Sequence, residues 1–112
     1  MTNTKEQVNK PKTPEEVEAD YKKEGLITKR FSEEPGQYHP PHAHEGSRIY
    51  TTEGSAHYRL DEGELQEVVA GQELRVQDDQ THEFTAGPEG WSYVFACSER
   101  EARRQGILPP TE

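Results

Sequence analysis

The sequence predicts an all-β protein, a small barrel or sandwich with one short helix at its N-terminal side. Three observations lead to this prediction. After Gly25 the apolar and β-branched residues come in short runs, as in β-strands. Turn-forming residues separate these runs at regular spacing, which is typical of barrels and sandwiches. Before Gly25 one stretch instead has the start signals and the spacing of a helix.

The composition restricts the kinds of partner. With 112 residues the chain is expected to form one domain, and 13 basic against 22 acidic residues leave a net charge of -9. Such a surface repels phosphates and anionic lipids, so we expect no nucleic acid and no membrane as partner. The hydrophobic fraction of 29% allows only a small core, and a homodimer would bury more apolar surface.

The cysteine count and the absence of export signals favour a cytoplasmic location. Cys97 is the one cysteine, so no disulfide can form within the chain, and its apolar strand is typical of an inert core thiol. No apolar run is long enough to cross a membrane, and no basic-then-apolar start indicates export.

The first structured element is expected to be a helix over residues 14–24, after a disordered tail over residues 1–12. Thr13 is placed to cap the helix, and Glu16 stands where a capping box has its carboxylate. Val17 and Tyr21 share one helix face and would dock it onto the barrel.

Short strands separated by turns follow the helix. We expect strands over residues 26–31, 37–44, 48–52, 56–60, 65–69, 73–76, 83–86 and 91–97. Turns are expected at residues 34–36, 53–54, 61–64 and 87–90, where Gly, Pro and Asp gather. Residues 99–112 form a C-terminal extension with a short polar helix over residues 99–105.

Three histidines carry the strongest chemical signal. Pro40 and Pro41 disfavour a helix, so His42 and His44 lie two apart in extended backbone and share one face. His82, brought opposite them by closure of the sheet, would complete a set of three imidazoles. Such a set suits a divalent transition metal (Fe, Mn, Ni, Zn or Cu) and leaves positions open for a ligand. The alternative is that the three are hydrogen-bonded core residues.

The same residues resemble the cupin family. The run from Gly36 through His42-Ala43-His44 to Gly54 is similar to the first cupin motif, G-x5-H-x-H-x3/4-E-x6-G. Gly71 and His82 stand at the glycine and the histidine of the second motif, G-x5-P-x-G-x2-H-x3-N. The resemblance implies a cupin double-stranded β-helix, or jelly-roll barrel, over residues 13–98. It also implies a metal bound by the three histidines, and a homodimer.

The chain departs from the first motif at the glutamate, the usual fourth ligand. Counting forward from His44 puts Arg48 or Ile49 at that place, and counting back from Gly54 puts Ser47 there. None of the three is a carboxylate, so the fourth ligand stays open.

Three further residues are candidates for ligand binding. Arg48 would clamp the carboxylate of a ligand if it faces inward, and would be an ordinary surface residue if it faces outward. His39 lies three before His42, on the opposite face of an ideal strand, and substitutes for the fourth ligand only if the prolines alter that. His57 follows Gly54 and would serve the site if it points into the barrel.

Two functions remain open at this point. The first is a metal-dependent enzyme, of the oxygenase, isomerase or decarboxylase kind that the resemblance implies. The second is a non-catalytic module for ligand binding or sensing, including one that has lost its metal and uses Arg48 as an anion clamp. No acid or base stands at an expected place, which favours the second, whereas three histidines in so polar a chain favour the first. We expect a metal-binding cupin-domain protein that takes a small molecule.

Overall fold

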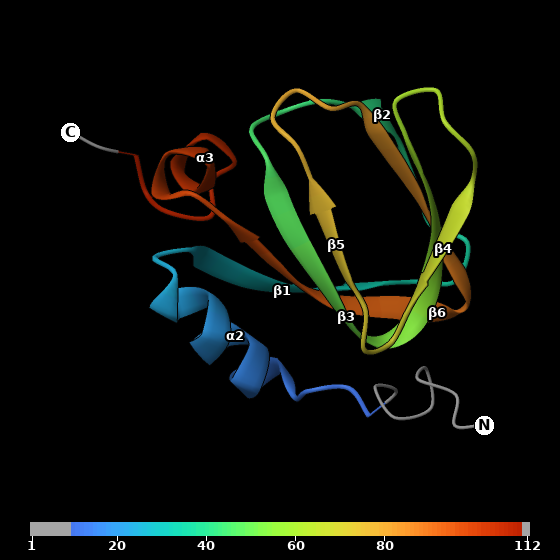
Figure 1. The fold of residues 1–112 in the computed structure, drawn as a ribbon, viewed down its shortest axis with the longest axis horizontal. Coiled ribbons are helices and arrows are strands. Elements are labelled where there is room, and N and C mark those ends of the chain that lie inside the picture. The colour runs from blue at the N-terminus through green and yellow to red at the C-terminus, as the bar shows by residue number, and fades with distance from the viewer. Residues whose placement is uncertain (1–9, 111–112) are drawn as a thin grey trace, which may run out of the picture.

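The computed structural model describes residues 10–110, and a β-barrel is its main feature (Figure 1). Most of the predicted N-terminal tail lies outside the described residues. Within them, six strands join in one antiparallel sheet: β1 (Ile27–Glu33), β2 (Tyr38–His42), β3 (Ser47–Leu60), β4 (Gln66–Val69), β5 (Glu73–Val76) and β6 (His82–Cys97). The predicted all-β barrel with a leading helix is confirmed.

The leading helix, α2 (Pro14–Lys23), forms as its sequence signals predict. The Thr13 hydroxyl accepts from the backbone N–H of Glu16, and the Glu16 carboxylate accepts from that of Thr13, which completes the capping box. Val17 and Tyr21 are buried against Val94 and Ala96 of β6. The helix therefore covers the outside of the barrel.

The two long strands hold the barrel together. β6 pairs with β1, β2 and β3, while β3 pairs also with β4 and β5. Each long strand bends midway, so that its two halves belong to different sides of the barrel (Figure 1).

The predicted turns at residues 53–54 and 87–90 are wrong, because both stretches lie within continuous strands. The pairing of β3 with β6 shifts register between Thr51 and Glu53 and again between Gly54 and Ala56, as at a β-bulge. Gly54 and Gly90 both have positive φ, 75° and 87°, and lie against each other. Glycine here bends a strand rather than reversing the chain.

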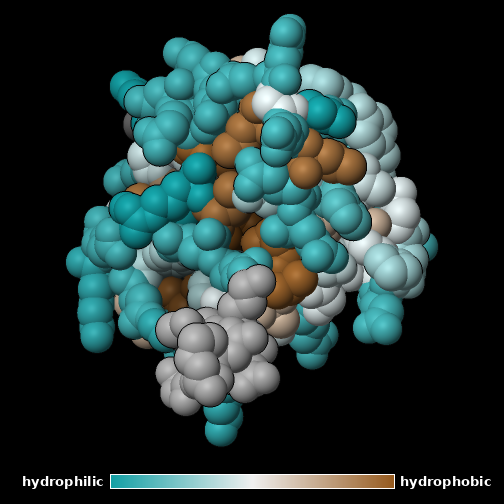
Figure 2. Space-filling view, turned by 45° about the vertical axis from the view of Figure 1, so that its right-hand side comes forward, coloured by the Kyte–Doolittle hydropathy of each residue, from teal (hydrophilic) through white to brown (hydrophobic). Residues whose placement is uncertain are grey.

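Aromatic side chains fill much of the barrel. The Trp91 ring stacks on Tyr93 with centroids 4.0 Å apart, and its N–H donates to the Thr51 hydroxyl at 2.9 Å. Phe31 also stacks on Tyr93, with ring centroids 5.3 Å apart. On the face shown in Figure 2, apolar side chains gather near the centre and hydrophilic ones surround them.

The C-terminal extension forms the predicted short helix, α3 (Glu99–Arg104), capped by the Ser98 hydroxyl. Its Ala102 packs into the barrel core. Within residues 10–110, no helix has the length and apolar character needed to cross a membrane.

Candidate metal centre

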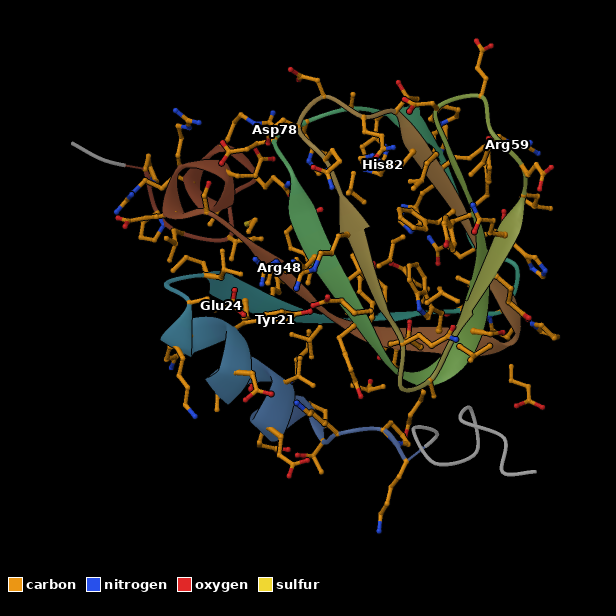
Figure 3. The ribbon with its side chains drawn as sticks, viewed as in Figure 1. Tyr21, Glu24, Arg48, Arg59, Asp78 and His82 are labelled. Atoms are coloured by element: carbon orange, nitrogen blue, oxygen red, sulfur yellow. The ribbon has the colours of Figure 1, made fainter. Side chains whose placement is uncertain are left out.

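The three predicted histidines meet at one end of the barrel cavity, where His82 is buried, His44 is half-buried and His42 is exposed. His42 ends β2, His44 lies in the loop before β3, and His82 begins β6 directly opposite His42. One nitrogen from each ring lies within 4.8 Å of the other two. Figure 3 shows His82 pointing into the space that the strands enclose.

Backbone carbonyls fix the orientation of all three rings. Nδ1 lies 2.8 Å from the Pro40 oxygen in His42, 2.7 Å from the Glu45 oxygen in His44, and 2.8 Å from the Gln80 oxygen in His82. A carbonyl can only accept, so each Nδ1 carries the proton and each neutral ring has its lone pair on Nε2. Such outer contacts orient the imidazoles of metal sites in the same way.

The spacing of the His44 and His82 nitrogens fits a shared cation. The Nε2 atoms of His44 and His82 lie 3.2 Å apart. Two nitrogens bound to one ion at about 2.0–2.1 Å are themselves about 2.8–3.4 Å apart, from neighbouring octahedral positions to tetrahedral ones. The three histidines can therefore hold one metal ion.

The protonation state of His82 also suits a metal ligand. The pKa of His82 is lowered to about 4, chiefly by burial and to a smaller extent by the His42 and His44 rings, against the opposing effect of the Gln80 carbonyl. His82 is therefore neutral near pH 7, and its Nε2 is free to bind a cation.

The three rings line a cavity of about 180 Å³ in the barrel. Its apolar wall is made by Phe31, Ile49, Phe84, Trp91, Tyr93 and Phe95. Glu33, His39, Ser47 and Gln105 add polar groups to the lining.

Glu33 is a cavity residue that the sequence analysis missed. Its side chain is 10% exposed, and Oε2 accepts from the Tyr93 hydroxyl at 2.8 Å. Burial, and then this hydrogen bond, raise the pKa of Tyr93, so the tyrosine stays a donor. The strand was expected to end at Phe31, but β1 continues to Glu33, and residues two apart share a face.

His39 joins Glu33 in the cavity, because β2 carries a bulge. His39 pairs with Phe84 and His42 with His82, so β2 has one residue more than β6 in this interval. The expectation of opposite faces is therefore wrong. His39 Nε2 lies 3.1 Å from Glu33 Oε2, and His39 is not among the three clustered nitrogens.

Glu101 on α3 lies behind the cluster. Its side chain is 2% exposed, and Oε2 is 3.7 Å from Nδ1 of His44. The Arg104 guanidinium, more than any other neighbour, holds the pKa of Glu101 below its usual range. In the sequence nothing separates Glu101 from its exposed neighbour Glu99, so only the fold identifies it.

Comparison with known proteins identifies the architecture. No protein-family model matches the chain, and neither does any curated protein. Among solved structures, an RmlC-like cupin from Shewanella frigidimarina is 25% identical with a TM-score of 0.56, over 64% of this chain and 64% of that one. A protein with a double-stranded β-helix domain from Klebsiella pneumoniae is 24% identical with a TM-score of 0.57, over 64% and 65%. This chain has the fold of a small cupin.

A larger cupin protein shares the same architecture. Oxalate decarboxylase from Bacillus subtilis, an enzyme with Mn(II) centres, is 21% identical with a TM-score of 0.59. The match covers 64% of this chain and 20% of that one. This chain also spans less than two thirds of the length of the first two smaller structures. The likeness to oxalate decarboxylase is one of fold.

Ser47 stands where the count back from Gly54 places the missing cupin glutamate. It is buried and lines the cavity, and its hydroxyl has no hydrogen-bond partner among the described residues. Ile49, one of the two positions counted forward from His44, also lines the cavity, whereas Arg48 does not. Glu45, the carboxylate that directly follows His44, pairs with Arg100 at 3.0 Å and does not line the cavity.

Arg48 lies outside the barrel, next to α2 (Figure 3). Its Nη1 is 2.5 Å from the Glu24 carboxylate, and its guanidinium lies 6.0 Å from the centre of the Tyr21 ring. Consecutive strand residues face opposite ways, so the inward position of Ser47 turns Arg48 outward. The inward alternative, a clamp on a ligand at the histidines, is not the arrangement found.

His57 is also separate from the cluster. It lies in β3 between Glu67 of β4 and Thr85 of β6, is exposed, and does not line the cavity. The structure thus brings together His42, His44 and His82, adds His39 at one side, and leaves Arg48 and His57 outside.

Proposed function

We propose that this protein is a metal-binding cupin that holds one divalent first-row metal through His42, His44 and His82 and binds a small molecule beside it. The observation that carries the proposal is the convergence of one nitrogen from each of three histidines whose Nδ1 atoms lie against backbone carbonyls. Such an arrangement leaves the coordinating lone pairs with no other use. The cavity gives a ligand access to the remaining coordination positions.

The donor set is compatible with several metals. Imidazole nitrogens suit Fe, Mn, Ni, Zn and Cu, and Mn is the metal named for the neighbour oxalate decarboxylase. When bound, such an ion supplies Lewis acidity to an oxygen or nitrogen of the ligand. The neutral rings, the apolar wall and the carbonyls behind the rings are what the chain itself contributes.

Metal analysis of the purified protein tests the proposal. We expect about one first-row metal per chain, and at least about tenfold weaker binding in His42→Ala and His82→Ala, because each removes a ligand. His57→Ala is the matched control, since His57 is an exposed histidine outside the cavity. Mass spectrometry of the bound metal measures all four proteins. Equal metal content in wild type, His42→Ala and His82→Ala would contradict the proposal.

One observation supports the enzymatic alternative. The sequence offered no group for proton transfer, whereas the cavity contains Glu33 with His39 beside it. A carboxylate and an imidazole next to a metal are the groups that general acid–base catalysis uses. A metal-dependent enzyme of the oxygenase or isomerase kind therefore remains the second candidate. The homodimer and the cytoplasmic location stay predictions.

A further inference from the structure

We propose that the cavity selects a small neutral or cationic ligand that donates a hydrogen bond to Glu33, in preference to a carboxylate. The inference rests on the proposed function, because one end of the ligand is taken to bind the metal at the three histidines. It concerns the other end of the ligand. An inward Arg48 would have favoured an acidic group there, whereas we infer a preference against one.

The charge of the cavity supports this preference. Among the residues described, the lining includes the carboxylate of Glu33 but no lysine and no arginine. Arg48, the one cation expected here, pairs with Glu24 on the outer side. A ligand carboxylate would meet a like charge in a site with few compensating groups, which disfavours it.

Glu33 is held as a hydrogen-bond acceptor. The Tyr93 hydroxyl donates to Oε2, and His39 Nε2 lies at 3.1 Å from that same oxygen without the alignment of a hydrogen bond. Within residues 10–110, Oε1 receives no hydrogen bond. A hydroxyl, amide or ammonium of a ligand would supply the donor that Oε1 lacks.

A second polar group in the cavity also lacks a partner. The Ser47 hydroxyl is buried and unpaired among the described residues, although it lines the same cavity. A buried polar group without a partner costs about 1–3 kcal/mol, and a ligand with polar atoms would recover part of it. Ser47 and Glu33 thus both favour a polar end on the ligand.

The remaining wall limits the ligand's size and body. A volume of about 180 Å³ is smaller than the roughly 300–1,000 Å³ of pockets for drug-sized ligands. Phe84, Trp91 and Phe95 present apolar rings to it. A small flat ring with one metal-binding atom and one polar substituent fits this description.

Substituted pyridines on the Co(II)-loaded protein test the proposal. Ring nitrogen binds the metal, and a substituent at position 3 cannot chelate it, so the substituent alone reports on the far end of the cavity. We expect 3-(hydroxymethyl)pyridine to bind at least about tenfold more tightly than pyridine-3-carboxylate, and the protonated 3-(aminomethyl)pyridine to bind at least as tightly as the alcohol. The visible spectrum of Co(II) measures each titration.

Variants assign the preference to one side chain. Glu33→Gln should reduce the alcohol-to-carboxylate ratio about tenfold or more. Glu34→Gln, at the exposed neighbouring residue, should leave it unchanged. Should Glu33→Gln fail to fold, the alcohol, ammonium and carboxylate series on wild type still decides.

Three results would overturn the proposal: a carboxylate that binds as tightly as the alcohol, an unchanged ratio in Glu33→Gln, or no spectral response to any pyridine by protein that holds Co(II). Failure of the proposed metal function would look different, because Co(II) itself would not bind before any pyridine is added.

Discussion

Each histidine of the cluster divides its two nitrogens between the backbone and the cavity. The carbonyls of Pro40, Glu45 and Gln80 hold the Nδ1 side, so the Nε2 side needs no other residue to orient it. What the cluster lacks, within the described residues, is a carboxylate at its open side. The effect of adding one therefore depends on which neighbouring side chain faces the cavity.

Ser47→Glu should tighten metal binding at least about tenfold, because it adds a charged ligand on the cavity side of β3. Arg48→Glu should not, because that side chain lies against α2. It should instead cost about 0–1 kcal/mol of stability by breaking the pair with Glu24. Competition with a chromophoric chelator measures both affinities. Tighter binding in Arg48→Glu with none in Ser47→Glu would reverse the assigned register.

At this scale the sequence predicted what depends on spacing alone. His42 and His44 are two apart, and one imidazole from the second motif completes the set. It did not predict His39 or Glu33, because a bulge in β2 and two further residues of β1 decide where those side chains point. Irregular pairing is set by contacts across the sheet, which single-sequence patterns do not contain.

Among the elements, the two long strands decide the shape of the cavity. β3 and β6 cross from one side of the barrel to the other at Gly54 and Gly90. Ser47 and His82, the first residues of these two bent strands, are both buried and line the cavity. The bend therefore supports both the fold and the site.

Gly54→Ala should destabilise the protein by more than the about 1–2 kcal/mol that positive φ alone costs a residue with a Cβ. The added Cβ would collide with the carbonyl oxygen of Gly90, which is backbone and cannot move freely. Gly106→Ala is the matched control. Its φ is 82°, yet a Cβ there meets nothing within 4 Å, so only the conformational cost applies. Urea unfolding measures the stability of both variants. Equal losses of stability would mean that β3 and β6 can move apart at Gly54 and Gly90 to make room for the added Cβ.

The bulges also explain why two predicted turns are wrong. Glu53-Gly54 and Gly87-Pro88-Glu89-Gly90 have the composition of loops, yet both lie in strands. Glycine is suited to a turn and to a bulge for the same reason, its tolerance of positive φ. The sequence therefore located the irregular points of the chain correctly but could not distinguish a reversal from a bend.

Residues 10–110 form two packed regions on the two sides of β6. One fills the barrel, and the other joins Val17 and Tyr21 of α2 to Val94 and Ala96. Each region contains a buried tyrosine whose hydroxyl donates to a carboxylate, Tyr93 to Glu33 inside and Tyr21 to Glu73 at 2.5 Å outside. The pKa of each tyrosine is raised in the folded protein, so the stability of both regions depends on pH in alkali.

Tyr21→Phe should make the protein less sensitive to alkali. Burial, and then the hydrogen bond to Glu73, raise the pKa of Tyr21 in the folded state, while the unfolded chain keeps a value of about 10. The resulting stability is fully present below about pH 10 and is lost as pH rises toward the folded-state value, because only the unfolded chain releases the proton. The slope that each such tyrosine contributes is half-developed at about pH 10 and approaches about 1.4 kcal/mol per pH unit near pH 11. Between about pH 9 and 11, wild type, with Tyr21 and Tyr93, should therefore lose about 1.4 kcal/mol more stability than the variant. Urea unfolding between about pH 9 and 11 measures the stability of both proteins.

Below about pH 9 the variant should be less stable than wild type by a constant amount, from the lost hydrogen bond. Parallel curves above pH 10 would mean that Tyr21 titrates alike in the folded and unfolded chain and does not link α2 to β5.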